Sequence, residues 1–311
     1  MRTAALAAAL LMLAGVPRTA DAQLLTAKDA PVVFGHYHLH VASIDEHKKF
    51  WGDALGGRPI KVGPLEAVAF PNVFVFVQQA KPEAPKVTTI DHIAFQVADL
   101  KAVIARLKAG GFTLATKENV ATQYQIADDI ASMPDEHMSA AFVVGPDGAK
   151  VELFERRNVA QQPVTGAAPI TFSHVHFQAQ DYTAIRKWYS DTFGAKPGNQ
   201  TFLYKGLDLP GLPGALQFSR MNRAAFTIMG SPMPFSTPAG QPAMPPTKNQ
   251  VVDHIGFEVR GLEAFIQQFE KNGGKMDLAY RKIPAMGLSI AFLTDPWGTY
   301  IELTEGLNAI P

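Results

Sequence analysis

Four histidines occupy the same position in four short repeats of this sequence. The repeats read HYHLHV, HIAFQV, HVHFQA and HIGFEV, and they begin at His36, His92, His174 and His254. In a β-strand, residues i and i+2 lie on one face, so each histidine lies opposite the apolar residues that alternate with it. With nine histidines in 311 residues, coincidence explains this pattern poorly. The repeats indicate a shared role, and a neutral imidazole is a common metal ligand.

Two glutamates recur in a similar way near the ends of two longer repeats. Glu152 lies in GPDGAKVEL and Glu302 in DPWGTYIEL, each between apolar neighbours. If the histidine-bearing faces of two strands line one cavity, each half of the chain can supply two histidines and one glutamate. Such a 2-His-1-carboxylate set leaves coordination positions open for a substrate. The alternative is that duplication preserved histidines with only a structural role.

The composition restricts the other ligands and partners. The chain contains no cysteine, so disulfides and thiolate metal sites are excluded. Its 28 basic and 28 acidic residues give a formal net charge of zero, which argues against a nucleic-acid surface or an anionic membrane surface. A small molecule is therefore the expected partner, and a homodimer stays open.

Each histidine repeat opens a module of one strand, one helix and about three further strands. Ser43 and Glu46 fit a capping box that starts a helix over residues 44–55, and Gly56 supplies its left-handed stop. Helices of the same kind are predicted at residues 100–109, 181–193 and 262–272. Short apolar segments rich in β-branched residues follow them, which favours strands. The first module matches the third and the second matches the fourth, so the chain consists of two halves.

The flanks and insertions set the expected boundaries. An apolar run after Arg2 that ends in the small-residue sequence ADA is typical of a secretory signal, and a retained membrane anchor is the alternative. The mature protein is expected to be periplasmic or secreted, with no membrane attachment after cleavage. We predict a signal at residues 1–22, a first domain at 23–157, a linker at 158–169 and a second domain at 170–311. Insertions at residues 118–138 and at the proline-rich residues 230–248 are candidate lids.

The histidine repeats and the two glutamate motifs resemble the vicinal oxygen chelate superfamily, also called the glyoxalase, bleomycin-resistance and extradiol dioxygenase group. The resemblance covers nearly all of the expected mature chain. It implies an α+β fold of four βαβββ modules, which form two paired-module domains with curved mixed sheets. It also implies a divalent metal that a small substrate chelates through two adjacent oxygens. The ligands it implies are His36, His92 and Glu152 in one half, and His174, His254 and Glu302 in the other.

The pairing of the modules is open, because some fused members join the first module with the fourth and the second with the third. The implied ligand sets would then be His36, His254 and Glu302, and His174, His92 and Glu152. Three further histidines are candidates for catalysis. His38 and His176 would face the same cavity and could contact substrate or donate protons, although cavity lining is an equal alternative. His137, on the first insertion, could be an acid or base, or a solvated loop residue.

Two departures from the family pattern bear on the reaction. Glyoxalase-like members carry a second acidic ligand, and the corresponding positions here are expected within residues 73–77 and 225–229, which contain no acid. Extradiol dioxygenases carry a tyrosine where this chain has Phe142 and Phe292. Neither chemistry is inherited in full.

Three functions follow in order of preference. The first is a metal enzyme that uses Fe2+ or Mn2+ and is nearest to extradiol dioxygenases by its ligand sets. The second is a glyoxalase-type lyase or isomerase with Zn2+ or Ni2+. The third is a non-catalytic binding protein of the resistance type.

Overall fold

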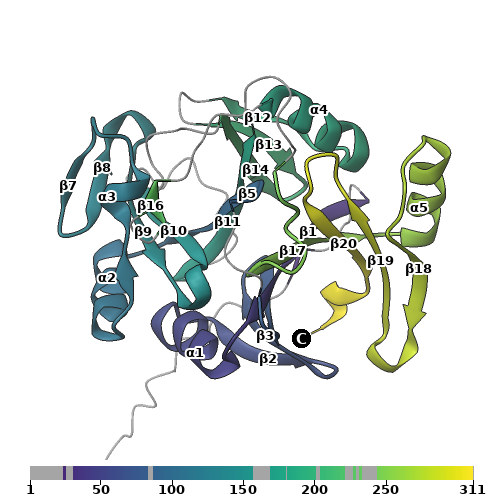
Figure 1. Cartoon of the computed structure of the whole chain (residues 1–311), viewed down its shortest axis with the longest axis horizontal. Coiled ribbons are helices and arrows are strands. Elements are labelled where there is room, and N and C mark those ends of the chain that lie inside the picture. Colours follow the sequence, from purple (N-terminus) through teal and green to yellow (C-terminus); the bar gives the residue numbers. More distant parts are fainter. Residues whose placement is uncertain are drawn as a thin grey trace, which may run out of the picture.

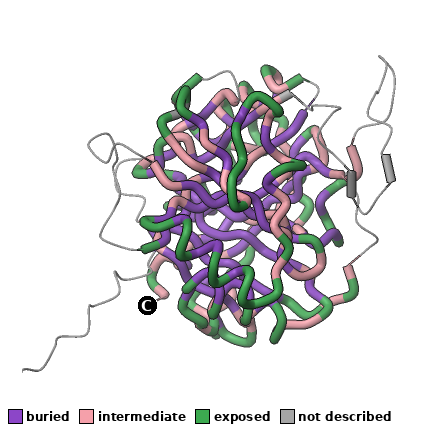
Figure 2. The backbone as a smooth tube through the Cα atoms, turned by 90° about the vertical axis from the view of Figure 1, so that its left-hand side faces the viewer, coloured by how far each residue is buried: buried purple, intermediate pink, exposed green. Residues whose placement is uncertain are grey.

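The computed structural model describes residues 24–25, 31–82, 87–156, 169–179, 181–200, 204–220, 227–228, 231–232 and 244–310. The predicted signal and all but the last residue of the predicted linker lie outside these ranges. The helices lie around the outside of two curved sheets (Figure 1), and the buried residues gather in the centre (Figure 2). No helix within the described ranges is long and apolar enough to cross a membrane.

The two odd modules share one plan of strand, helix and three strands, as predicted. The first contains β1 (Val32–Val41), α1 (Ile44–Lys48), a π-helical turn (Lys49–Ala54), β2 (Arg58–Val62), β3 (Leu65–Phe70) and β4 (Val73–Gln79). The third contains β11 (Ile170–Ala179), α4 (Tyr182–Phe193), β12 (Lys196–Gln200), β13 (Lys205–Leu209) and β14 (Leu212–Arg220). A short hairpin of β15 (Thr227–Ile228) and β16 (Ser231–Pro232) follows.

The second and fourth modules follow the same plan, and the second module is longer than the fourth. It contains β5 (Ile90–Val97), α2 (Leu100–Ala109), β6 (Thr113–Leu114), α3 (Thr116–Asn119), β7 (Gln125–Ala127), β8 (Ile130–Met133), β9 (Met138–Val144) and β10 (Lys150–Arg156). The fourth contains β17 (Val252–Val259), α5 (Leu262–Lys271), β18 (Leu278–Ile283), β19 (Leu288–Thr294) and β20 (Tyr300–Glu305). The first predicted insertion, residues 118–138, therefore forms the end of α3 and all of β7 and β8, and it widens one sheet. Most of the second insertion lies outside the described residues.

Side-chain caps start α1 and α2 where the sequence predicts these helices to begin. Ser43 Oγ accepts a hydrogen bond from the Glu46 backbone N–H at 3.3 Å, and Asp99 Oδ1 accepts one from Ala102 at 2.9 Å. These contacts satisfy backbone donors that have no partner within the helix. The predicted helix at 44–55 differs in one respect, because its second half widens into the π-helical turn. That turn buries Phe50 and Trp51 completely.

Each sheet combines one module from each half of the chain. The eight-stranded sheet has the order β18-β19-β20-β17-β1-β4-β3-β2, and the larger sheet has the order β12-β13-β14-β11-β5-β10-β9-β8-β7, with β6 beside β9. The first module thus joins the fourth, and the second joins the third, which is the second of the two pairings that the sequence left open. The halves at 23–157 and 170–311 follow the duplication of the sequence, but neither coincides with one sheet.

Two histidine strands lie antiparallel at the centre of each sheet. His38 of β1 is opposite His254 of β17, and His176 of β11 is opposite His92 of β5. The register shifts just before the first histidine of β1 and of β11, as expected where a β-bulge adds a residue to one strand. The bulge lets Phe34 and Phe172 point into the core while the histidines that follow point away from it.

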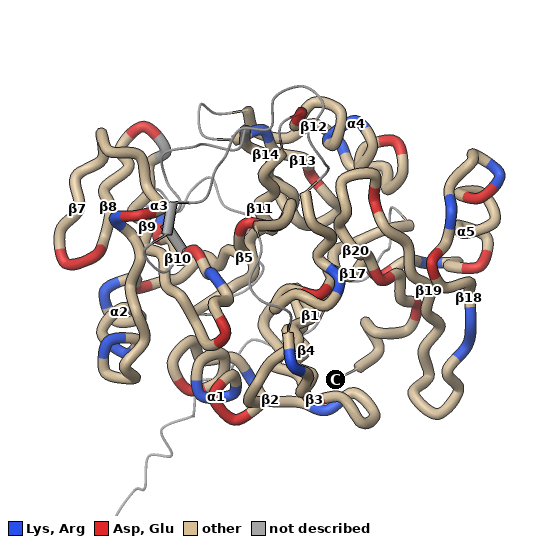
Figure 3. Tube along the Cα trace, viewed as in Figure 1, with Lys and Arg blue, Asp and Glu red and all other residues tan. Residues whose placement is uncertain are grey.

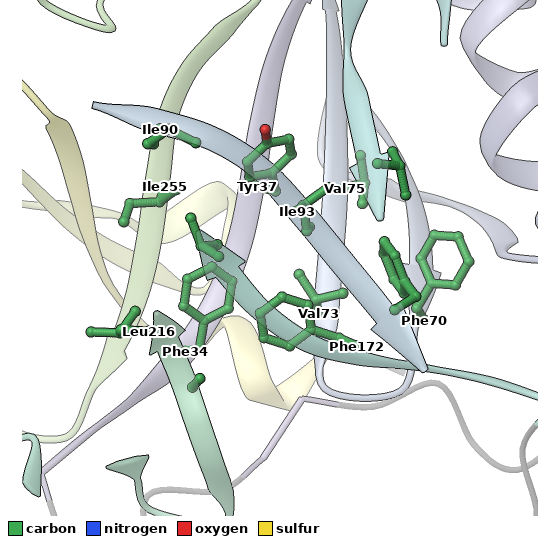
Figure 4. Packing of buried hydrophobic residues seen from close by; sticks show 14 of the residues in the cluster. Phe34, Tyr37, Phe70, Val73, Val75, Ile90, Ile93, Phe172, Leu216 and Ile255 are labelled. Carbon is green, nitrogen blue, oxygen red and sulfur yellow. The ribbon is translucent and has the colours of Figure 1, made fainter. Parts of the chain in front are cut away.

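The two sheets share one hydrophobic core on the faces opposite the histidines. Phe34 of β1 stacks on Phe172 of β11 with 4.7 Å between ring centroids, and Phe95 of β5 meets Phe172 edge-on at 6.2 Å. Figure 4 shows the rings of Phe34 and Phe172 among aliphatic side chains of both sheets. The histidine face of each sheet is therefore turned away from this core. Lys, Arg, Asp and Glu are interspersed along the described chain (Figure 3).

We predict that Phe172→Ala destabilises the whole molecule, because it removes a fully packed ring from the contact between the sheets. Truncation of a buried phenylalanine costs about 3–5 kcal/mol. The measurement is the free energy of unfolding from chemical denaturation. Ile126→Ala is the control, because this side chain is 38% exposed, and a change within about 0.5 kcal/mol is expected for it. Equal effects of the two substitutions would contradict a shared core.

Candidate metal centres

Two clusters of imidazole and carboxylate groups lie on the sheet faces turned away from the shared core. In the first, the atoms that could bind a metal all lie within 4.8 Å of one another, and they belong to His36, His38, His254 and Glu302. We call this cluster the His36 site. The second has the same spacing among His92, His174 and His176, and Glu152 contacts two of them. We call it the His174 site.

In the His36 site, one carboxylate oxygen lies between two imidazoles. Glu302 Oε2 is 2.9 Å from His36 Nε2 and 3.1 Å from His254 Nε2. The pairing of β17 with β20 places Glu302 beside Gly256, two residues after His254 and on the same face. The side chains of His36 and His254 are nearly fully buried, and that of Glu302 is 14% exposed.

The His174 site repeats this arrangement in the other sheet. Glu152 Oε2 is 3.1 Å from His92 Nε2 and 3.3 Å from His174 Nε2. Here β5 pairs with β10, and Glu152 lies beside Ala94, two residues after His92. The structure thus brings together one histidine from an odd module with one histidine and one glutamate from an even module, twice.

The geometry of both clusters fits a divalent transition metal. Nε2 of His36 and Nε2 of His174 are buried and make no hydrogen bond within the described residues, although a carboxylate oxygen is close to each. Two ligand atoms that are each about 2.1 Å from one ion lie about 3.0–3.4 Å apart at right-angled to tetrahedral geometry. The carboxylate–imidazole separations of 2.9–3.3 Å are close to that range. Imidazole and carboxylate are also a donor set that such ions favour.

An aspartate orients one histidine in each site. Asp91 Oδ2 lies 2.6 Å from His92 Nδ1, and Asp253 Oδ1 lies 2.6 Å from His254 Nδ1. An aspartate in this position accepts a hydrogen bond from Nδ1–H and so leaves Nε2 directed at the glutamate. Such outer partners fix the tautomer of a metal-binding histidine and raise its basicity.

The carboxylates keep their negative charge although they are buried. Burial alone would raise the pKa of Glu152 and of Glu302, but the neighbouring imidazoles outweigh it and hold both pKa values well below the usual range. Burial would likewise lower the pKa of His92 and of His254, but each lies between two carboxylates, and its pKa is raised. Each site therefore carries fixed negative charge that attracts a cation.

A glycine makes room for one ring of the His36 site. A Cβ atom built on Gly256 would overlap the His36 imidazole, whereas Ala94 occupies the corresponding place in the other site. His174 has its own support there, because Gln217 Nε2 and Ser173 Oγ each lie 3.1 Å from His174 Nδ1. His36 has no hydrogen-bond partner on either nitrogen within the described residues.

The partners behind the two aspartates differ. In the His174 site, Lys150 Nζ lies 2.7 Å from Asp91 and also donates to Asn119 Oδ1 at 2.9 Å. In the His36 site, Asp253 Oδ2 accepts the Asn249 N–H at 2.6 Å and lies 3.4 Å from His40 Nδ1. A lysine thus stabilises one aspartate, while a backbone amide and a histidine stabilise the other.

Aromatic rings form one wall of each site. Phe142 meets His92 edge-on at 5.2 Å, and Phe292 meets His254 edge-on at 5.3 Å. These are the positions at which the sequence has phenylalanine instead of tyrosine. Tyr300 adds a phenol to the His36 site, 5.8 Å from the His254 ring. Burial and the charge of Asp253 raise its pKa to about 12, so the phenol stays protonated.

The structure places two of the three predicted catalytic histidines in the clusters. His38 belongs to the His36 site and His176 to the His174 site. His137 is exposed at the turn between β8 and β9 and belongs to neither cluster of the described residues. The extended backbone of the insertion carries it away from both sites.

One predicted position is wrong. The last strand of the third module is β14 (Leu212–Arg220), so the place of a second acidic ligand is not within residues 225–229. It falls at Gln217, the cross-strand neighbour of His176, and the corresponding residue of the first module is Phe76, the neighbour of His38. Pro213 and Gly214 obscure the strand in the sequence. In the first module this position, at Phe76, does lie within the expected residues 73–77.

Asp91 and Asp253 are site residues that were not predicted from the sequence. A signal was present, because both even repeats contain the tripeptide Asp-His-Ile. Gln217 had no comparable signal.

We predict that Gly256→Ala selectively impairs the His36 site, because the new methyl group must displace the His36 ring. The measurement is the number of bound metal equivalents, expected to fall from about two to one with the fold retained. Gly52→Ala is the control, because the nearest atom to its Cβ would be at 3.7 Å, an ordinary contact. Full metal content in Gly256→Ala would contradict the role of His36.

We further predict that Lys150→Met strengthens metal binding at the His174 site alone. The substitution removes a positive charge near the bound cation and lets Asp91 donate more electron density to His92. The increase should stay below the roughly 10–100-fold effect of a partner that contacts a ligand directly. The affinity is measured by calorimetry in a Glu302→Ala background, where only the His174 site remains. Lys187→Met is the control, because Lys187 is 75% exposed in a surface ion pair. A lower affinity in Lys150→Met would contradict this electrostatic role.

Comparison with known proteins supports the fold and its duplication. Models of the Glyoxalase/Bleomycin resistance protein/Dioxygenase superfamily match residues 35–127 and 171–303. No curated protein sequence matches the chain. Among solved structures, glyoxalase I from Zea mays is similar with a TM-score of 0.62 at 15% identity, over 91% of this chain and 96% of that chain.

A proposed dioxygenase from Bacillus subtilis is similar with a TM-score of 0.58 at 12% identity, over 89% of this chain and 86% of that chain. At 15% and 12% sequence identity, these similarities are evidence for a shared fold only. The two family matches together span most of the sequence, and each contains the histidine repeats of its half. The chain therefore belongs to the glyoxalase, bleomycin resistance protein and dioxygenase superfamily, also called the vicinal oxygen chelate superfamily.

Proposed function

We propose that this protein is a divalent-metal-dependent enzyme whose small substrate binds through two neighbouring oxygen atoms, with chemistry nearest to that of extradiol dioxygenases. The observation that carries the proposal is the repeated sharing of one buried glutamate between two histidines, at separations of 2.9–3.3 Å. The ion, when bound, would supply Lewis-acid chemistry at the two substrate oxygens. Fe2+ or Mn2+ suits the donor set best.

The surroundings of the sites support an apolar substrate body. Phe74, Phe76, Ala67 and Ala69 are buried near the His36 site, together with Leu307 after the last strand. Val120, Tyr124, Met133 and Phe154 form a comparable cluster near the His174 site. Ligand sites of this composition bind apolar molecules and use few polar groups to orient them. A catechol, with two vicinal oxygens on an aromatic ring, has this character.

The carboxylate count favours the dioxygenase reaction over the glyoxalase reaction. A glyoxalase-type proton transfer uses a second carboxylate as its base, and Phe76 and Gln217 stand where that acid would be. Ring opening of an extradiol type takes up one dioxygen molecule, and both oxygen atoms remain in the product. It therefore needs no further reductant. A glyoxalase-type lyase or isomerase is the second candidate because the Zea mays glyoxalase I shares the fold.

We also propose that the mature protein is exported, on the sequence of residues 1–22. Amino-terminal sequencing of the protein from the periplasm and the medium tests this, and a cytoplasmic protein that retains Met1 would contradict it.

Metal analysis of the purified protein tests the proposed function. We expect about two equivalents of metal, falling to about one in Glu152→Ala and in Glu302→Ala, because each variant loses the carboxylate that contacts two imidazoles of one site. Glu118→Ala is the matched control, since that glutamate belongs to neither site, and it should retain both metals. A parent protein that binds no metal after reconstitution would contradict the proposal.

Turnover then separates the candidate functions. Oxygen consumption with catechols supports the dioxygenase, and anaerobic conversion of adducts between 2-oxoaldehydes and thiols supports the glyoxalase-type reaction. Tight binding of either compound without turnover would favour the non-catalytic binding protein.

A further inference from the structure

We propose that the second histidine of each odd repeat, His38 and His176, is itself a metal ligand, so that each site is a 3-His-1-Glu centre. This inference rests on the metal of the proposed function. It assigns both histidines to the coordination sphere, in place of the proton-transfer role that the sequence suggested. Their position, their hydrogen bonds and their neighbours support it in turn.

Position is the first argument. The ligand-capable atoms of His38 lie within 4.8 Å of those of His36, His254 and Glu302, and His176 has the same relation to His92 and His174. Ligand atoms on opposite sides of one ion at about 2.1 Å lie at most about 4.2 Å apart, so small side-chain movements bring all four ligands of the His36 site onto one ion. The ring centroids of His38 and His254 are 4.3 Å apart, and those of His176 and His92 are 4.7 Å apart. In the His174 site the three histidines meet the same 4.8 Å limit, and Glu152 contacts His92 and His174.

The outer hydrogen bonds are the second argument. His38 Nε2 lies 3.2 Å from Gln78 Oε1, and His176 Nε2 lies 2.8 Å from Ser219 Oγ. An amide oxygen only accepts hydrogen bonds, so His38 carries its proton on Nε2 and has a lone pair on Nδ1. A metal-binding histidine typically donates its other N–H to such a partner. Gln78 and Ser219 come from equivalent strands, β4 and β14.

The strand beside each histidine supplies the third argument. His38 is the cross-strand neighbour of Phe76, and His176 is the neighbour of Gln217. Phe76 has no atom that could bind a metal, and the Gln217 amide is directed at the other nitrogen of His174. In the described structure, a fourth protein ligand is therefore best supplied by β1 and β11 themselves.

The test counts imidazole ligands directly. A His92→Ala, Glu152→Ala background leaves only the His36 site, which is loaded with Mn2+ or Co2+ and examined by pulsed electron paramagnetic resonance and X-ray absorption. We expect three imidazoles in this parent and two in His38→Asn. The metal affinity should fall by at least roughly 10–100-fold, since loss of an outer-shell partner alone has that effect. His137→Asn is the matched control, because it removes an exposed histidine outside both clusters.

The outcomes separate this inference from the proposed function. Two imidazoles in the parent, or an unchanged affinity in His38→Asn, would overturn the 3-His-1-Glu assignment and leave the metal enzyme intact. No metal binding in the parent would overturn both. If His38→Asn does not fold, the imidazole count of the parent decides alone.

Discussion

The alternation of side chains along a β-strand is the constraint on which this structure depends. Because successive residues point to opposite faces, one strand such as β1 contributes Tyr37 and Leu39 to the shared core and His36 and His38 to a site. The core contacts fix the strand in place, and the histidines on the other face are fixed with it. A one-residue shift in register would place imidazoles in the core and aliphatic side chains in the site. Metal-binding geometry is thus held by hydrophobic packing.

Burial makes the charges in these sites costly, and the structure shows how they are compensated. An isolated carboxylate in an apolar environment would become protonated, but Glu302 and Glu152 each lie between two imidazoles. The compensation is incomplete, because Nε2 of His36 and of His174 has no hydrogen bond within the described residues. A bound cation would complete it. Metal binding would then add to the stability of the fold, since ligand binding to the native state alone stabilises that state.

Much of the fold could be predicted from local sequence, whereas the composition of each site could not. The period of two, the capping residues and the repeats predict the modules, because these signals lie within short segments. Module pairing depends on contacts between strands that are far apart in sequence, such as β1 with β17. The histidine repeats do not indicate which other repeat each one pairs with. Gln217 was missed for a local reason, because Pro213 and Gly214 interrupt the pattern of its strand. His137 stays a prediction: it is exposed at the turn between β8 and β9 and lies outside both clusters of the described residues.

The duplication produced two sites with the same ligand types and different surroundings, and this difference has physical consequences. Lys150 adds a positive charge behind Asp91, which lowers the electron density that Asp91 can pass to His92. In the other site, Asp253 has no lysine partner among the described contacts and meets a backbone amide and His40 instead, so His254 faces a less neutralised carboxylate. Since such partners set the basicity of a ligand, the His36 site should polarise a bound substrate less strongly than the His174 site does. Identical ligands therefore do not require identical activities.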